Sequence, residues 1–170
     1  MVEVKIGIDI DGVLTLLPLR INFRLPWWFG IWLAFVPANK KMLRVLKKWK
    51  KDNHKIIIIS ERPKKLIQIT KWWLRRYGVS YDQIFLNDGS KKKEEQKLGI
   101  IKREEINIFI EDDPIVFNFL KKNYPSLKIF FPKQVLNSAC FFLSIFNKKS
   151  WIPRLLVHYP LDILKKIWKI

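Results

Sequence analysis

The chain has 170 residues, a length that suits one domain with a full hydrophobic core and is short for two. Lysine and arginine number 33 against 15 aspartate and glutamate residues, which gives a formal net charge of +18. Because 49% of the residues are hydrophobic and 28% are charged, the composition excludes a disordered chain. The charge predicts attraction to phosphate groups. We therefore expect a single domain over residues 1–170.

Cys140 is the single cysteine, which excludes an intrachain disulfide and a cysteine-based metal cluster. The first apolar run begins almost at Met1, so we expect no signal peptide before it. The longest apolar run, residues 25–36, is shorter than the ~20 residues that a membrane-spanning helix needs. These features predict a cytoplasmic protein, with peripheral attachment to a membrane left open.

Short apolar runs rich in Ile, Val and Phe recur along the chain and predict strands. They cover residues 4–10, 55–59, 83–86, 106–110 and 128–131. Continuous apolar runs of this kind are typical of parallel strands that are covered on both faces.

Amphipathic stretches lie between these runs and predict helices. Residues 40–51 carry Met42, Val45, Leu46 and Trp49 at helical spacing, with lysine and arginine at most other positions. A second helix is expected from Pro63 to a stop at Gly78, and a third begins at Pro114. This alternation predicts an α/β fold with a doubly wound, mostly parallel, Rossmann-like sheet.

Residues 14–39 interrupt the alternation, because they are apolar, aromatic and punctuated by Pro18, Pro26 and Pro37. We expect an insertion between the first strand and its crossover helix.

Polar side chains follow three of the predicted strands. Asp9 and Asp11 end the first, Ser60 follows the second, and Asp112 follows the fourth. Because the carboxyl ends of parallel strands meet at one sheet edge, we expect these carboxylates to converge there. Clustered carboxylates need a compensating cation, and an oxygen-only ligand set suits Mg²⁺. Gly12 would allow a sharp turn beside the metal.

The sequence resembles the haloacid dehalogenase superfamily of phosphohydrolases, and within it the nucleotidase-like branch with a small cap. Three motifs in order carry the resemblance, which spans about residues 4–131. They are residues 6–15 (IGIDIDGVLT), residues 56–60 (IIIIS) and residues 108–114 (IFIEDDP). The insertion at residues 14–39 lies where the superfamily has a cap that selects substrate.

The resemblance implies a role for each motif residue. Asp9 would be the nucleophile and Asp11 the general acid and base. Ser60 would donate a hydrogen bond to a phosphoryl oxygen. Lys91 is the favoured third-motif lysine, although Lys92, Lys93 and Lys97 also compete for that place.

The implied metal ligands are the side chains of Asp9 and Asp112 with the main-chain carbonyl of Asp11. Asp113 is expected to cap a helix, and its ligation of the metal stays open. For Arg62, contact with a substrate phosphate and a surface location are both open.

The predicted function is that of a Mg²⁺-dependent phosphatase. It would hydrolyse a phosphomonoester, a phosphorylated small molecule such as a nucleotide, through an aspartyl-phosphate intermediate. The alternative is a catalytically idle module of the same fold that binds an anionic membrane or nucleic acid. Substrate identity and oligomeric state are not predicted.

Residues 147–170 form a basic, amphipathic C-terminal extension in which Ile163, Ile167 and Trp168 lie opposite Lys165 and Lys169 on a helical projection. Such a segment suits an anionic membrane surface, and it also suits packing on the sheet. Nucleic acid is a less favoured partner, since no binding motif is recognised.

Overall fold

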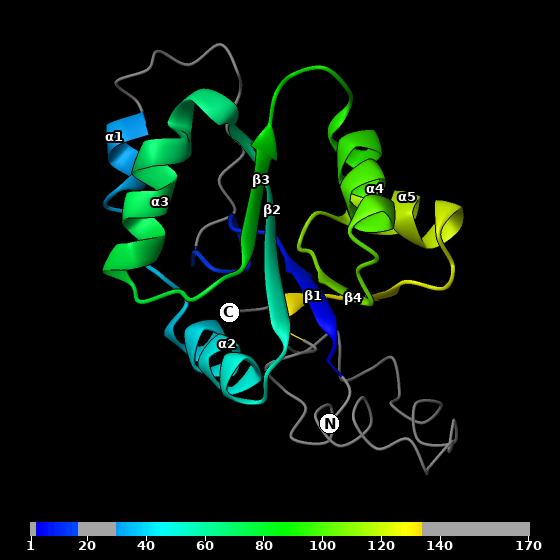
Figure 1. The fold of residues 1–170 in the computed structure, drawn as a ribbon. Helices are drawn as coiled ribbons and strands as arrows, with labels where there is room; N and C mark the ends of the chain where they lie inside the picture. Colours follow the sequence, from blue (N-terminus) through cyan, green and yellow to red (C-terminus); the bar gives the residue numbers. More distant parts are fainter. Residues whose placement is uncertain (1–2, 17–29, 134–170) are drawn as a thin grey trace, which may run out of the picture. The chain divides into compact units, whose positions relative to one another are not determined.

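The computed structural model describes residues 3–16 and 30–133 (Figure 1). These residues belong to one compact unit, Met1–Asn137. Their sheet has the strand order β3-β2-β1-β4-β5, and every neighbouring pair is parallel. The strands are β1 (Lys5–Ile8), β2 (Lys55–Pro63), β3 (Gln83–Asn87), β4 (Ile108–Ile110) and β5 (Lys128–Phe130). The predicted doubly wound parallel α/β fold is confirmed.

Helices cover both faces of the sheet (Figure 1). The chain moves outward from β1 to β2 and β3, then crosses back to β4 and β5. Because crossover connections are right-handed, this reversal changes the face that the helices cover. Helices α2 (Lys40–Lys51) and α3 (Ile67–Arg76) lie on one face, and α4 (Lys93–Arg103) and α5 (Pro114–Asn123) lie on the other.

The apolar runs bury their side chains between these layers. Ile6 and Ile8 of β1 are fully buried, and so are Ile56 and Ile58 of the neighbouring β2. On the α4–α5 side, Ile101 and Phe109 form a core with Leu120. Each such side chain contributes about 1.5–3 kcal/mol when it leaves water. The sheet's centre is therefore a rigid support for the loops that follow the strands.

Three elements differ from the sequence-based predictions. Strand β2 runs past the predicted end at Ile59 to Pro63, with an irregular register against β3. The next helix begins only after a short 3₁₀ turn, η2 (Lys64–Leu66). Helix α4 was not predicted at all, because its charged sequence and Gly99 conceal its buried side.

The described ends of the predicted cap insertion lie against the sheet domain. Thr15 and Ala38 form an antiparallel bridge, and a short helix α1 (Gly30–Leu33) precedes Ala38. Leu33 and Val36 pack on Leu66. Residues 17–29 of the predicted cap, and the predicted extension at 147–170, lie outside the described residues. Over the ranges that are described, no helix has the length and apolar character to cross a bilayer.

Candidate active site

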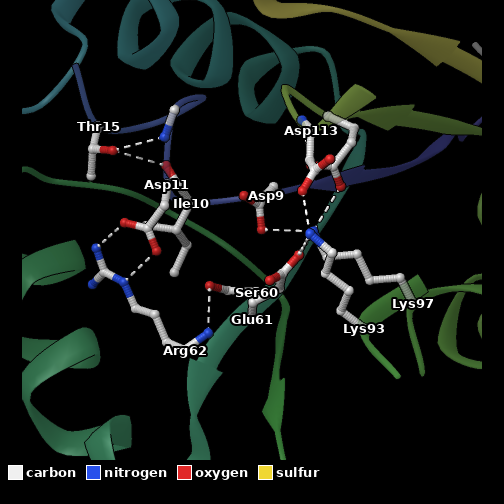
Figure 2. Close-up of polar contacts among 12 residues, drawn as sticks. Asp9, Ile10, Asp11, Thr15, Ser60, Glu61, Arg62, Lys93, Lys97 and Asp113 are labelled. Atoms are coloured by element: carbon white, nitrogen blue, oxygen red, sulfur yellow. Dashed lines mark hydrogen bonds and ion pairs between the residues drawn. The ribbon is translucent and has the colours of Figure 1, made fainter. Parts of the chain in front are cut away.

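The carboxyl ends of β1, β2 and β4 bring the predicted site residues to one edge of the sheet (Figure 2). Asp9 follows β1, and its backbone N–H donates a hydrogen bond to the Ile110 carbonyl of β4 at 3.1 Å. Ser60 lies in β2, on the other side of β1. Asp9 and Ser60 are 5% and 4% exposed, so both are nearly shielded from water.

The loop after β1 turns sharply at Gly12, where φ is +79°. A Cβ at this position would collide with the carboxylate of Asp112. Thr15 supports the turn, because its Oγ1 accepts a hydrogen bond from the Gly12 N–H at 2.9 Å. The predicted tight turn beside Asp112 is thus present, and it directs the side chains of Asp9 and Asp11 to different surroundings.

Lys97 is the cation beside Asp9. Its Nζ lies 3.2 Å from the Asp9 carboxylate and 2.7 Å from that of Glu111, and the side chain is buried (Figure 2). Burial opposes the charge, but the carboxylates of Asp9, Glu111 and Glu61 raise the pKa of Lys97 above its ordinary value. Lys97 therefore stays protonated and carries a fixed positive charge at this edge of the sheet.

Of the four candidate lysines, Lys97 lies beside Asp9, whereas the favoured Lys91 is exposed in the segment before α4. The spacing argument took no account of α4, whose helical turn places Lys97 on the inner side. Lys93, one turn earlier, is paired with Asp113 and lies 3.7 Å from Glu61. Lys97, Ile100 and Ile101 are buried together on one side of α4. Their spacing of three and four residues is the helical pattern that was present in the sequence.

Asp11 is paired with Arg62. The guanidinium donates hydrogen bonds from Nε and Nη2 to the two carboxylate oxygens, at 2.9 and 2.7 Å (Figure 2). Arg62 is 1% exposed, and its carbon Cζ lies 5.7 Å from the ring centroid of Trp73. Its Nη1 is buried without a hydrogen-bond partner among the described residues. A surface location for Arg62 is therefore wrong.

The side chain of Ser60 is held by a backbone hydrogen bond, since the Arg62 N–H donates to Ser60 Oγ at 3.2 Å. This contact forms where β2 continues past its predicted end. It leaves the Ser60 hydroxyl able to donate to a further acceptor.

Asp9, Glu111 and Asp112 form an acidic cluster in which one carboxylate oxygen of each residue lies within 4.8 Å of the others. Burial raises the pKa of Asp9 well above its usual value despite the opposing charge of Lys97. Burial and the charge of Glu111 raise the pKa of Asp112 to about 6. Ionised carboxylates are therefore costly at this point without a further cation, and an all-oxygen donor set fits a hard divalent cation such as Mg²⁺.

The three acids are not equivalent. Glu111 accepts from Lys97 and, at 3.1 Å, from the backbone N–H of Asp113. Asp9 and Asp112, the two side chains expected to be metal ligands, both belong to this cluster. Asp113 caps α5, because its carboxylate accepts from the Ile115 N–H at 2.8 Å, and this confirms its expected capping role.

No protein-family model matches this chain, and no curated protein matches it. Solved structures do. A chain of the Pnkp1/Rnl/Hen1 RNA repair complex aligns with a TM-score of 0.63 and 21% identity, over 76% of this chain and 42% of that one. This protein thus spans less than half the length of that relative.

Two phosphatase structures are also similar. The class C acid phosphatase of Bacillus anthracis, with tungstate bound, has a TM-score of 0.53 and 18% identity, over 78% of this chain and 68% of that one. The D,D-heptose 1,7-bisphosphate phosphatase of B. bronchiseptica, in complex with magnesium and phosphate, has a TM-score of 0.54 and 14% identity, over 78% and 85%. At these identities the likeness shows a shared fold.

Proposed function

We propose that this protein, whose fold is that of the haloacid dehalogenase superfamily, is a phosphohydrolase that releases phosphate from a phosphomonoester. The observation that carries the proposal is the contrast between Asp9 and Asp11, two acids on one loop. Asp9 lies beside Lys97 in the acidic cluster, whereas Asp11 pairs with Arg62. Two carboxyl groups in different environments suit the two roles of nucleophile and acid–base catalyst.

In the proposed reaction, an Asp9 carboxylate oxygen attacks phosphorus, and the bond from phosphorus to the leaving oxygen breaks. Asp11 donates a proton to that oxygen, then accepts one from the water that hydrolyses the aspartyl phosphate. Lys97 and the Ser60 hydroxyl would stabilise charge on the phosphoryl oxygens. The buried position of Asp9 and Ser60 supports this assignment, because hydrogen bonds and charges act most strongly where water is excluded.

Asp9, Asp112 and the main-chain carbonyl of Asp11 would hold Mg²⁺. When bound, the ion would neutralise the acidic cluster and the charge of the incoming phosphate. The proximity of the Asp9 and Asp112 carboxylates supports this part of the proposal.

Arg62 would act on the reaction through Asp11. Its two hydrogen bonds fix the orientation of the Asp11 carboxylate, and the Trp73 ring lies close to the guanidinium. Both Asp11 oxygens accept from Arg62, so one of these hydrogen bonds must open when Asp11 takes up the proton that it donates to the leaving oxygen. The other hydrogen bond would keep the carboxyl group in place. We therefore regard Arg62 as a positioning residue.

Phosphate release from a panel of phosphomonoesters tests the proposal. The panel contains an aryl phosphate, nucleotides, sugar phosphates, lipid phosphates and phosphorylated nucleic-acid ends, each with Mg²⁺. We expect turnover of at least one member by the unmodified protein and none by the Asp9→Asn variant. Equal release by both would contradict the proposal, and no release from any member would favour the alternative of a catalytically idle binding module.

A further inference from the structure

Charge is distributed unevenly between the two helical layers. Helices α2 and α3 and the turn η2 contain no acidic residue, and every exposed side chain of α2 is a lysine or an arginine. The layer on the opposite face is mixed, because α4 begins with Glu94 and Glu95. Among the helices that the structure describes, the excess positive charge is thus concentrated on the α2–α3 side, where a negatively charged partner would be attracted.

Large apolar side chains are exposed on the same layer. Trp72 of α3 is 41% exposed, with the Arg76 guanidinium carbon 5.2 Å from its ring centroid, whereas its neighbour Trp73 is fully buried. Helix α1 packs against α3. Trp32 of α1 is 64% exposed and Phe35 is 67% exposed. The domain has a core large enough to bury other aromatic side chains, so the size of the core does not explain why these groups are exposed.

We infer that this α1–α3 surface, defined by Trp32, Phe35, Lys71, Trp72, Arg75 and Arg76, docks on an anionic lipid bilayer. Tryptophan and phenylalanine enter the headgroup region with their apolar parts inward, and lysine and arginine contact lipid phosphates around them. The inference does not depend on catalysis, because it uses no residue of the active site.

Charge complementarity argues for this occupant, and the composition of the surface favours lipid over nucleic acid. The lysine and arginine side chains could contact the phosphates of nucleic acid as well as those of lipid, so the exposed apolar groups decide between the two partners. Phe35, which is two-thirds exposed, adds an apolar group that suits the interior side of a headgroup layer.

Cosedimentation of the full chain with vesicles tests the inference. One vesicle type is pure phosphatidylcholine, and the other contains equal parts phosphatidylcholine and phosphatidylglycerol. The test variant is Lys71→Gln/Arg75→Gln on α3. The matched control is Lys121→Gln/Lys122→Gln on α5, which removes the same charge from the opposite face. Melting temperatures establish that both variants remain folded.

We expect the unmodified protein to bind the anionic vesicles and not the neutral ones at low salt. The α3 variant should bind on the order of thirtyfold more weakly, since each basic residue at an anionic surface contributes about fivefold. The α5 control should bind nearly as well as the unmodified protein. Trp72→Ala should reduce the vesicle binding that remains at high salt, because salt screens the attraction between charges but not the insertion of an apolar ring.

Three results would overturn the inference. One is an unmodified protein that stays in the supernatant with anionic vesicles. Another is equal weakening by the α3 and α5 pairs, which would mean that total charge alone governs binding. The third is an α3 variant that binds vesicles normally but loses binding to a single-stranded oligonucleotide, which would assign the surface to nucleic acid.

Discussion

The guanidinium of Arg62 and the carboxylate of Asp11 form a buried, two-point ion pair, with contacts of 2.9 and 2.7 Å. The two residues belong to neighbouring strands of the sheet, since Asp11 lies in the loop after β1 and Arg62 is the last residue but one of β2. The pair joins the neighbouring strands at the edge where Asp9 lies.

Loss of the Arg62 side chain should destabilise the fold, because Asp11 loses its partner. Arg62→Met leaves a buried carboxylate without its partner, so we expect the free energy of unfolding to fall by about 3 kcal/mol in a denaturant titration. Arg103→Met, which removes an exposed arginine paired with Glu104, should change it by less than about 1 kcal/mol. Equal losses in both variants would contradict the structural role of the Arg62–Asp11 pair.

Arg62 should affect catalysis only through Asp11, which a double-mutant cycle can measure. We expect Arg62→Met to lower kcat in the unmodified background and to have little further effect in Asp11→Asn. Arg62→Lys should restore part of the activity. Additive effects of the two substitutions would mean that Arg62 contacts substrate directly.

The general-acid role of Asp11 predicts a dependence on the leaving group. Asp11→Asn should slow an alkyl phosphate much more than an aryl phosphate, because a poor leaving group needs protonation most. The ratio of kcat/KM for the two substrate classes is the measurement. Equal slowing of both would remove Asp11 from the acid role.

Lys97 and Lys91 should differ sharply. Lys97→Met removes the cation beside Asp9 and leaves Glu111 buried and unpaired, so we expect loss of turnover and a free energy of unfolding lower by about 3 kcal/mol. Lys91→Met alters an exposed side chain and should change neither quantity appreciably. Adding Glu111→Gln to Lys97→Met should recover stability without recovering turnover. A Lys91 variant that loses activity while Lys97→Met retains it would reverse the assignment.

Metal dependence follows from the acidic cluster. EDTA should abolish turnover and Mg²⁺ should restore it, while Asp112→Ala should raise the Mg²⁺ concentration needed for half-maximal activity by at least tenfold. The matched change, Asp113→Ala, removes a helix cap and should lower stability by about 1 kcal/mol with a smaller effect on the Mg²⁺ titration. An unchanged titration for Asp112→Ala would exclude Asp112 as a ligand.

The strands could be predicted because a buried parallel strand appears in the sequence as a short apolar run. The positions of the site residues could be predicted because the polar residue after such a run lies at the carboxyl edge of the sheet. Helix α4 could not, since its buried side includes Lys97 and its sequence is dominated by charge. The preference for Lys91 over Lys97 has the same origin. The burial of Arg62 depends on the extension of β2 past Ile59, which no local pattern in the sequence indicates.

The measurement that tests the central claim most directly is phosphate release by the unmodified protein and by Asp9→Asn, each with Mg²⁺ and with EDTA, from the best substrate of the panel. Melting temperatures recorded without metal serve as the folding control. Since burial raises the pKa of Asp9, the neutral asparagine should leave stability equal or higher. We predict that the unmodified protein releases phosphate with Mg²⁺ and not with EDTA, and that the folded Asp9→Asn variant releases none in either condition. Release by Asp9→Asn at the rate of the unmodified protein would contradict Asp9 as the nucleophile.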